Sequence, residues 1–290
     1  MLVCSVAGLC LASCNKLYSS PEVMVETSAD ETGYSPILFE AGVFGAEVET
    51  KAVTEVTNST LSSFYASATT GSAGSEVSAW TSSSFSKSGS TYVGGKYWPN
   101  SDPGYHFFAS NLGLNFAASG TTVSPTGVAT DVVCAYLPSP TYKSSNQLSF
   151  QHIFGRIGTM TVSAATGYTL SNISITITPK VPQSSGTTYN LRTGAWSGTV
   201  DGSSTQLANS TAGTKTNDFL LVPGSYTLTA SYTVTRGDYV ENVSSKTATV
   251  EIPAGKTSNI SCTLGGNASE IVFTVDVAAW QANAITATFN

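Results

Sequence analysis

The feature that most constrains the fold is a strict alternation of apolar and polar residues in the second half of the chain. Within residues 225–234, the apolar set is Tyr226, Leu228, Ala230, Tyr232 and Val234, and Ser or Thr occupies every position between. Successive side chains of a β-strand point to opposite faces, so this period predicts a strand with one buried face. The same pattern recurs at Ile173–Ile177, Ala248–Ile252, Ile260–Leu264 and Ile271–Val277. Short strands separated by Gly-containing turns are typical of a β-sandwich.

The first half of the chain contains less regular segments of the same type. We expect strands at Phe44–Thr50, Leu61–Ala68, Tyr105–Ser110, Val132–Leu137 and Leu148–Phe154. Val132–Leu137 is apolar on both faces, which favours a central strand. The Ser- and Gly-rich stretch Gly71–Gly95 is expected to form a long hairpin or an exposed loop. Because no segment keeps a helical period, the sequence predicts an all-β protein.

Length and the strand pattern indicate two domains. The 290 residues exceed the usual domain size of roughly 100–200 residues. With a boundary near Gly155, we expect an N-terminal β-sandwich at residues 36–154 and a C-terminal β-sandwich at residues 155–290. They follow a signal peptide at residues 1–13 and a solvated tether at residues 14–35.

Composition excludes two classes of protein. Charged residues make up 10% of the chain, against about 25% in an average protein, and the net charge is −6. This balance offers no basic surface for a nucleic-acid backbone. The hydrophobic content of 41% is too high for an intrinsically disordered chain.

The amino terminus has the features of a lipoprotein export signal. Leu2–Ala12 is apolar over a length that suits a signal peptide and is too short to span a bilayer. It ends in Leu11-Ala12-Ser13-Cys14, which resembles a bacterial lipobox. Lipidation of Cys14, for example with palmitate, would anchor the chain, since each buried CH₂ contributes about 0.8 kcal/mol. The alternative is an ordinary signal peptide in which the cysteine is coincidental.

The candidate residues for chemistry do not form a catalytic or metal-binding set. His152 shares parity with Phe150 and Phe154, so we expect a hydrogen-bonded core histidine. A triad of His106, Asp102 and a serine is conceivable, but no Gly-x-Ser-x-Gly motif is present. Two histidines are too few for the usual metal cluster. We therefore expect no enzyme activity, no metal and no cofactor.

The remaining cysteines and the tryptophans are interpreted as packing residues or exposed contacts. Cys134 and Cys262 are expected to be buried thiols without a disulfide. Trp98 and Trp280 are expected to be packing anchors. Trp80 and Trp196 lie in Ser- and Gly-rich surroundings and are the first choice for exposed contacts with a sugar ring, although packing is the favoured interpretation for each of them singly.

Several landmarks together resemble the fimbrillins, the pilus subunits of Bacteroidales bacteria. In chain order they are the lipobox at Cys14, Thr50-Lys51-Ala52, Lys96-Tyr97-Trp98-Pro99, Phe150-Gln151-His152, Leu221–Tyr226, Ile252–Thr257 and Val275–Trp280. The resemblance extends from the lipobox to the end of the chain, and the order and spacing of the landmarks carry it. It implies two tandem transthyretin-like (immunoglobulin-like) β-sandwich domains.

The resemblance also implies a function and a maturation route. We expect a structural or adhesive subunit of a cell-surface pilus (fimbria), exported as a lipoprotein to the outer membrane and assembled with other pilus subunits by β-strand exchange. Trimming would occur between Lys51 and Ala52, although many fimbrillins have arginine at the position of Lys51. Ile285, Ala287 and Phe289 share one face of the last segment and are the candidate donor strand. The alternative is a monomeric outer-membrane surface lipoprotein that binds glycan or host protein.

Overall fold

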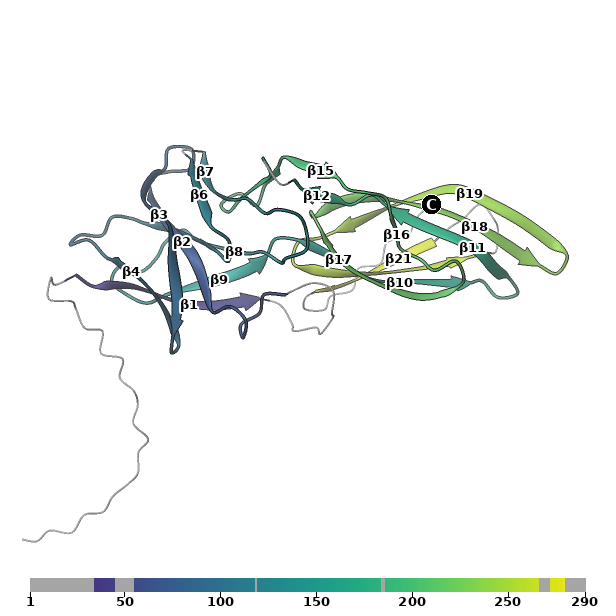
Figure 1. The fold of residues 1–290 in the computed structure, drawn as a ribbon, viewed down its shortest axis with the longest axis horizontal. Coiled ribbons are helices and arrows are strands. Elements are labelled where there is room, and N and C mark those ends of the chain that lie inside the picture. The colour runs from purple at the N-terminus through teal and green to yellow at the C-terminus, as the bar shows by residue number, and fades with distance from the viewer. Residues whose placement is uncertain (1–33, 45–54, 118, 184–185, 266–271, 280–290) are drawn as a thin grey trace, which may run out of the picture.

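The computed structural model describes residues 34–44, 55–117, 119–183, 186–265 and 272–279, and the structural statements below concern these residues. Every regular element within them is a β-strand, which confirms the all-β class. No helix in these ranges could cross a membrane. The strands form an elongated molecule with the first half of the chain at one end and the second half at the other (Figure 1).

Seven strands of the first half close into a barrel in the order β1-β4-β3-β2-β5-β8-β9. Their bounds are β1 Pro36–Phe44, β2 Ser63–Thr70, β3 Val77–Ser88, β4 Thr91–Tyr97, β5 His106–Ser110, β8 Val133–Leu137 and β9 Asn146–His152. Neighbouring strands are antiparallel, except that β1 runs parallel to β9. Closure pairs both edges of every strand and leaves no open sheet edge.

Aromatic rings fill the barrel because alternate residues of each strand point inward. Phe39, Phe64, Phe85, Phe107 and Phe150 are each at most 1% exposed. The ring of Phe85 covers the backbone of β4 at Gly94, where an added Cβ would lie 2.6 Å from the ring. A glycine is therefore required at this point of close approach.

The second half forms two four-stranded sheets, β17-β10-β20-β21 and β16-β11-β18-β19. The bounds are β10 Gly155–Ala164, β11 Thr169–Ile177, β16 Thr205–Gln206, β17 Gly213–Leu221, β18 Gly224–Arg236, β19 Tyr239–Ile252, β20 Lys256–Leu264 and β21 Val272–Ala279. All five alternating apolar residues predicted between Tyr226 and Val234 are buried in one core cluster. The two-residue period therefore identified β18 and its buried face correctly.

A third sheet combines strands from both halves. It has the order β14-β13-β7-β6, with β6 Leu114–Ala117 and β7 Gly120–Val123 from the first half, and β13 Thr188–Asn190 and β14 Trp196–Ser197 from the second. A small sheet of β12 Lys180–Pro182 and β15 Thr199–Asp201 lies at the base of the β13–β14 hairpin. Figure 1 shows β6 and β7 on the same side of the molecule as β12 and β15.

A hydrophobic cluster lies between the halves. It includes Phe108 of β5, Val132, Phe154, Leu220 of β17 and Val222, all at most 4% exposed. Since its members come from both halves, each half buries apolar area that it would expose alone.

Four of the five strands expected in the first half are confirmed to within two residues at each end, as β2, β5, β8 and β9. Gly71–Gly95 contains the β3–β4 hairpin, the first of the two forms expected. The expected strand at Phe44–Thr50 lies outside the described residues after Phe44, and β1 just before it was missed. The strands of the first half close into a barrel, and this closure does not confirm a sandwich there. The division into two tandem transthyretin-like sandwiches remains a prediction.

Candidate functional site

The candidate site begins with β1, which occupies a slot in the barrel wall. β1 pairs antiparallel with β4, where Phe39 faces Tyr92, and parallel with β9 from Phe39↔Asn146 to Phe44↔Gln151. Its alternation of Ile37, Phe39, Ala41 and Val43 gives the strand an apolar face that points into the barrel. Removal of β1 would leave β4 and β9 with unpaired backbone groups.

Phe39 fills the centre of this slot and is fully buried. Its ring centroid lies 4.9 Å from those of Phe85 and Phe107, with edge-to-face geometry, and 6.0 Å from that of Phe64. Such aromatic pairs contribute about 0.5–1.5 kcal/mol beyond the burial of their area. Phe39 is therefore the main side chain by which β1 is held.

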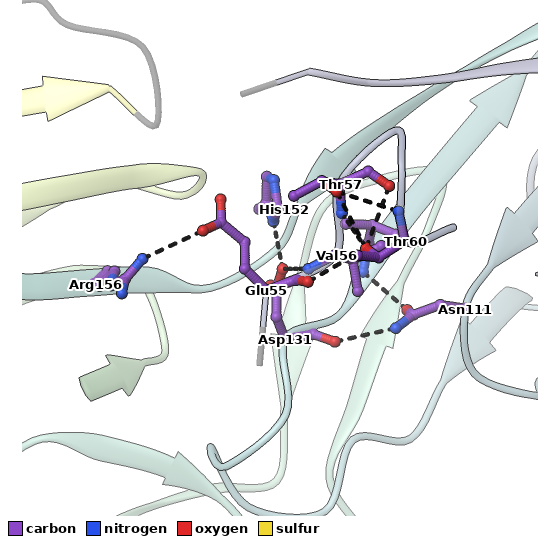
Figure 2. Close-up of polar contacts among 9 residues, drawn as sticks. Glu55, Val56, Thr57, Thr60, Asn111, Asp131, His152 and Arg156 are labelled. Atoms are coloured by element: carbon purple, nitrogen blue, oxygen red, sulfur yellow. Dashed lines mark hydrogen bonds and ion pairs between the residues drawn. The ribbon is translucent and has the colours of Figure 1, made fainter. Parts of the chain in front are cut away.

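A buried polar cluster contacts Glu55 and Val56, where the described residues resume (Figure 2). Oδ2 of Asp131, a residue with no solvent exposure, accepts a hydrogen bond from the Val56 N–H at 3.1 Å and lies 2.7 Å from Nδ1 of His152. Asn111 donates to the Asp131 carbonyl at 3.0 Å. A buried carboxylate needs such partners, so this arrangement fixes the chain at Val56.

Arg156, at the start of the second half, extends the cluster across the junction. Its side chain is 2% exposed and lies 3.7 Å from the Glu55 carboxylate. Its Nε donates to Asp218 Oδ1 at 2.7 Å, and Asp218 adopts a left-handed φ of 49°. A buried arginine is stabilised by paired carboxylates, so residue 55 is bound by both halves of the molecule.

The end of β1 is joined to the same segment. The Val43 N–H donates to Asn58 Oδ1 at 2.6 Å. A turn follows in which the Leu61 N–H donates to the Thr57 carbonyl at 2.9 Å. Val43 and Asn58, which lie on either side of residues 45–54 in the sequence, are thus in contact on the barrel.

The site residues expected from the sequence, which are Cys14, Lys51, Ala52, Ile285, Ala287 and Phe289, all lie outside the described residues, and their roles remain predictions. Sequence reasoning missed Asp131 and Arg156, because partners in the cluster are far apart in the chain. The alternation in β1 was a usable signal, since Ile37, Phe39, Ala41 and Val43 have one parity.

The histidines have structural contacts. His152 is buried and hydrogen-bonded, as predicted. His106 has its ring nitrogens 2.6 Å from the Pro138 carbonyl and 3.1 Å from the Gly71 carbonyl, and Asp102 accepts from the Gly104 N–H instead. The imagined triad of His106 and Asp102 is therefore not assembled.

The structure places the described tryptophans against the hydrophobic core, the interpretation favoured for each of them singly. Trp80 and Trp196 are partly buried and pack against core clusters rather than projecting as contacts. Trp196 packs against Phe154 and Tyr189 in tilted geometry, with ring centroids 5.2 Å from each. Trp98 is 1% exposed, which confirms it as a packing anchor, and Trp280 lies outside the described residues.

The two cysteines of the body are buried free thiols, as expected. Burial raises the pKa of Cys134 and of Cys262 to about 12. Such thiols are unreactive near neutral pH. Within the described ranges, no group of three His, Cys, Asp or Glu residues could hold a metal ion.

Comparison with known proteins identifies the family. The sequence model of the fimbrillin-like proteins matches residues 46–280, which is most of the chain. The chain belongs to the fimbrillin-like family. No curated protein matches the sequence of this fimbrillin-like chain.

Solved structures similar to this fimbrillin-like protein come from Bacteroides and Parabacteroides species. A protein of Bacteroides ovatus assigned to cell adhesion is 16% identical, with 86% of this chain and 99% of that chain covered and a TM-score of 0.44. A cell adhesion assignment also applies to a Parabacteroides distasonis protein with 7% identity, coverage of 85% and 97%, and a TM-score of 0.47. A fimbrial assembly protein of Parabacteroides distasonis is 12% identical, with coverage of 83% and 95% and a TM-score of 0.40.

Proposed function

We propose that this fimbrillin-like chain is a structural or adhesive subunit of a cell-surface pilus, exported as an outer-membrane lipoprotein through Cys14 and assembled by strand exchange. The observation that carries the proposal is the position of β1 in the barrel wall, where it is paired with β4 on one side and with β9 on the other. Every residue of β1 precedes Lys51 in the chain, so a cut between Lys51 and Ala52 would separate β1 covalently from the barrel. After the cut, β1 would be held only by hydrogen bonds and side-chain packing.

The slot has the properties that an incoming strand needs. It offers unpaired backbone groups on β4 and β9, and pockets vacated by Ile37, Phe39 and Val43. Burial of each such side chain contributes about 1.5–3 kcal/mol. The last segment of a neighbouring subunit, with Ile285, Ala287 and Phe289 on one face, supplies an apolar strand of this kind.

The polar cluster supports the same route. Asp131 binds the Val56 N–H, and Arg156 lies against Glu55, only a few residues after the proposed cut. These contacts belong to the part of the chain that stays. The new amino terminus would remain attached to the barrel while β1 leaves.

The test is to compare surface material from cells that produce the wild type, Lys51→Gln or Lys87→Gln. Lys87 is an exposed residue of β3 and serves as the matched control. We expect the wild type and the control to start at Ala52 and to give high-mass ladders in mild detergent. Lys51→Gln should start at Cys14 and give no ladder.

Two further variants separate the parts of the proposal. Cys14→Ala should abolish labelling with a palmitate analogue, and deletion of residues 285–290 should leave a folded monomer that forms no ladder. If the wild type, Lys51→Gln and the deletion variant instead all give one acylated species that begins at Cys14 and retains carbohydrate or a host protein, the monomeric surface lipoprotein is the correct function.

A further inference from the structure

We propose that the β13–β14 hairpin, residues 188–197, is a brace that joins the two halves into one cooperatively folded rigid unit, with Arg192 as its key residue. The inference is independent of the pilus role. It concerns a hairpin that belongs to the second half by sequence and contacts the first half by its backbone, its charge and its aromatic side chains.

The backbone of the brace adds strands to a sheet of the first half. Tyr189 pairs with Val123, and Asn190 pairs with Thr122. The Leu191 N–H continues the pairing by donating to the Thr121 carbonyl at 3.1 Å. Backbone pairing of this kind fixes the register and direction of the hairpin against β7.

The turn of the brace aims Arg192 at the barrel. Oδ1 of Asn190 accepts hydrogen bonds from the N–H groups of Arg192 and Thr193, each at 3.0 Å. An asparagine side chain that accepts from the amides two and three residues further on stabilises a tight turn. Gly194 continues the turn with a left-handed φ of 69°. The local sequence thus fixes the backbone turn from which the Arg192 side chain reaches the first half.

Arg192 then makes two kinds of contact with the first half. Its Nη2 lies 2.5 Å from Oε1 of Glu76, whose side chain has no solvent exposure. Its guanidinium carbon lies 4.9 Å from the ring centroid of Tyr136 and 5.6 Å from that of Phe108. A fully buried carboxylate is costly without a cation, and a guanidinium stacks well on aromatic rings. The first half therefore depends on an arginine from the second.

The base of the brace is fixed to the second half. β12 and β15 pair from Lys180↔Asp201 to Pro182↔Thr199. The Val222 N–H donates to the Lys180 carbonyl at 2.9 Å, which ties this base to the connection between β17 and β18. The hairpin is therefore bound at both ends, and movement of one half relative to the other would break these contacts.

Two of the three arginines in the chain make ion pairs between the two halves. Of the three arginines in the sequence, Arg156 pairs with Glu55 and Arg192 pairs with Glu76, and these two glutamates flank β2 on either side. Both pairs cross from the second half to the first. The third, Arg236, lies on the exposed tip of the β18–β19 hairpin and stacks on Tyr168 of its own half at 5.3 Å. Arg236 is therefore a matched control.

The test uses hydrogen exchange and thermal unfolding of the full chain. In Arg192→Met, the amides of β7 and the brace should exchange at least tenfold faster than in the wild type, while those of β18 keep their rates. The single unfolding transition of the wild type should separate into two. Arg236→Met should retain wild-type exchange and one transition.

A second variant guards against a general folding defect. In Glu76→Gln, the neutral amide leaves Arg192 in place on its aromatic rings, so exchange in the brace should rise less than in Arg192→Met, and the double variant should show non-additive rates. The proposal is overturned if Arg192→Met and Arg236→Met exchange alike, or if the wild type already unfolds in two transitions.

Discussion

Phe39→Ala tests the most heavily packed side chain of β1. The substitution removes a fully buried ring that contacts three other rings at centroid distances of 4.9–6.0 Å. Buried Phe→Ala changes lower the free energy of unfolding by about 3–5 kcal/mol, because transfer and cavity terms add. We expect a value in this range, since β1 is held by β4 and β9 on both sides and the slot cannot collapse.

The measurement is urea unfolding followed by circular dichroism, with Phe44→Ala as the control on the same strand. With an m value of about 3 kcal/mol/M, the loss lowers the unfolding midpoint by about 1–1.7 M. Phe44 is 60% exposed, so its replacement should change the free energy by less than about 0.5 kcal/mol. Equal midpoints for the two variants would refute the assignment of Phe39 as the anchor of β1.

Two further predictions concern packing and the buried thiols. Gly94→Ala should lower the free energy of unfolding by about 1–3 kcal/mol, since the added Cβ would lie 2.6 Å from the Phe85 ring. Gly42→Ala is the control and should not be destabilising, because the nearest atom to its Cβ lies at 4.0 Å. Equal denaturant midpoints for the two variants would contradict this prediction. Because burial raises the pKa of Cys134 and Cys262 from 9.0 to about 12, the folded chain retains both thiol protons, and its stability should fall as the pH rises above about 9. At pH 8 a disulfide reagent should therefore titrate two fewer thiols in the native than in the denatured protein, and equal titres would show that these cysteines are accessible.

The parts of the fold that depend on local pattern were predictable from the sequence. β18 follows directly from ten residues of alternation, because burial of one face requires no knowledge of the neighbouring strands. β1 has the same signal over fewer residues, and its partner β9 lies more than a hundred residues away, so closure of the barrel could not be read from sequence.

The candidate site was predictable only in part, for the same reason. Parity indicated that His152 is a core residue, but its partner Asp131 lies in an irregular segment before β8 and has no periodic signal. The charges of Arg156 and Arg192 were visible in the sequence. Their partners Glu55 and Glu76 are set by tertiary contacts that no local rule specifies.

The sheet shared by the two halves has a consequence for the time course of folding. β7 finds its partner β13 roughly 65 residues further along the chain, and pairing over such separations is slow because loop closure precedes the gain from contact. The sheet of β6 and β7 gains its remaining strands only when the β13–β14 brace docks against β7. We therefore expect Phe108, Tyr136 and the Glu76 carboxylate to stay exposed to solvent until the brace docks, and the chain to be prone to aggregation up to that point.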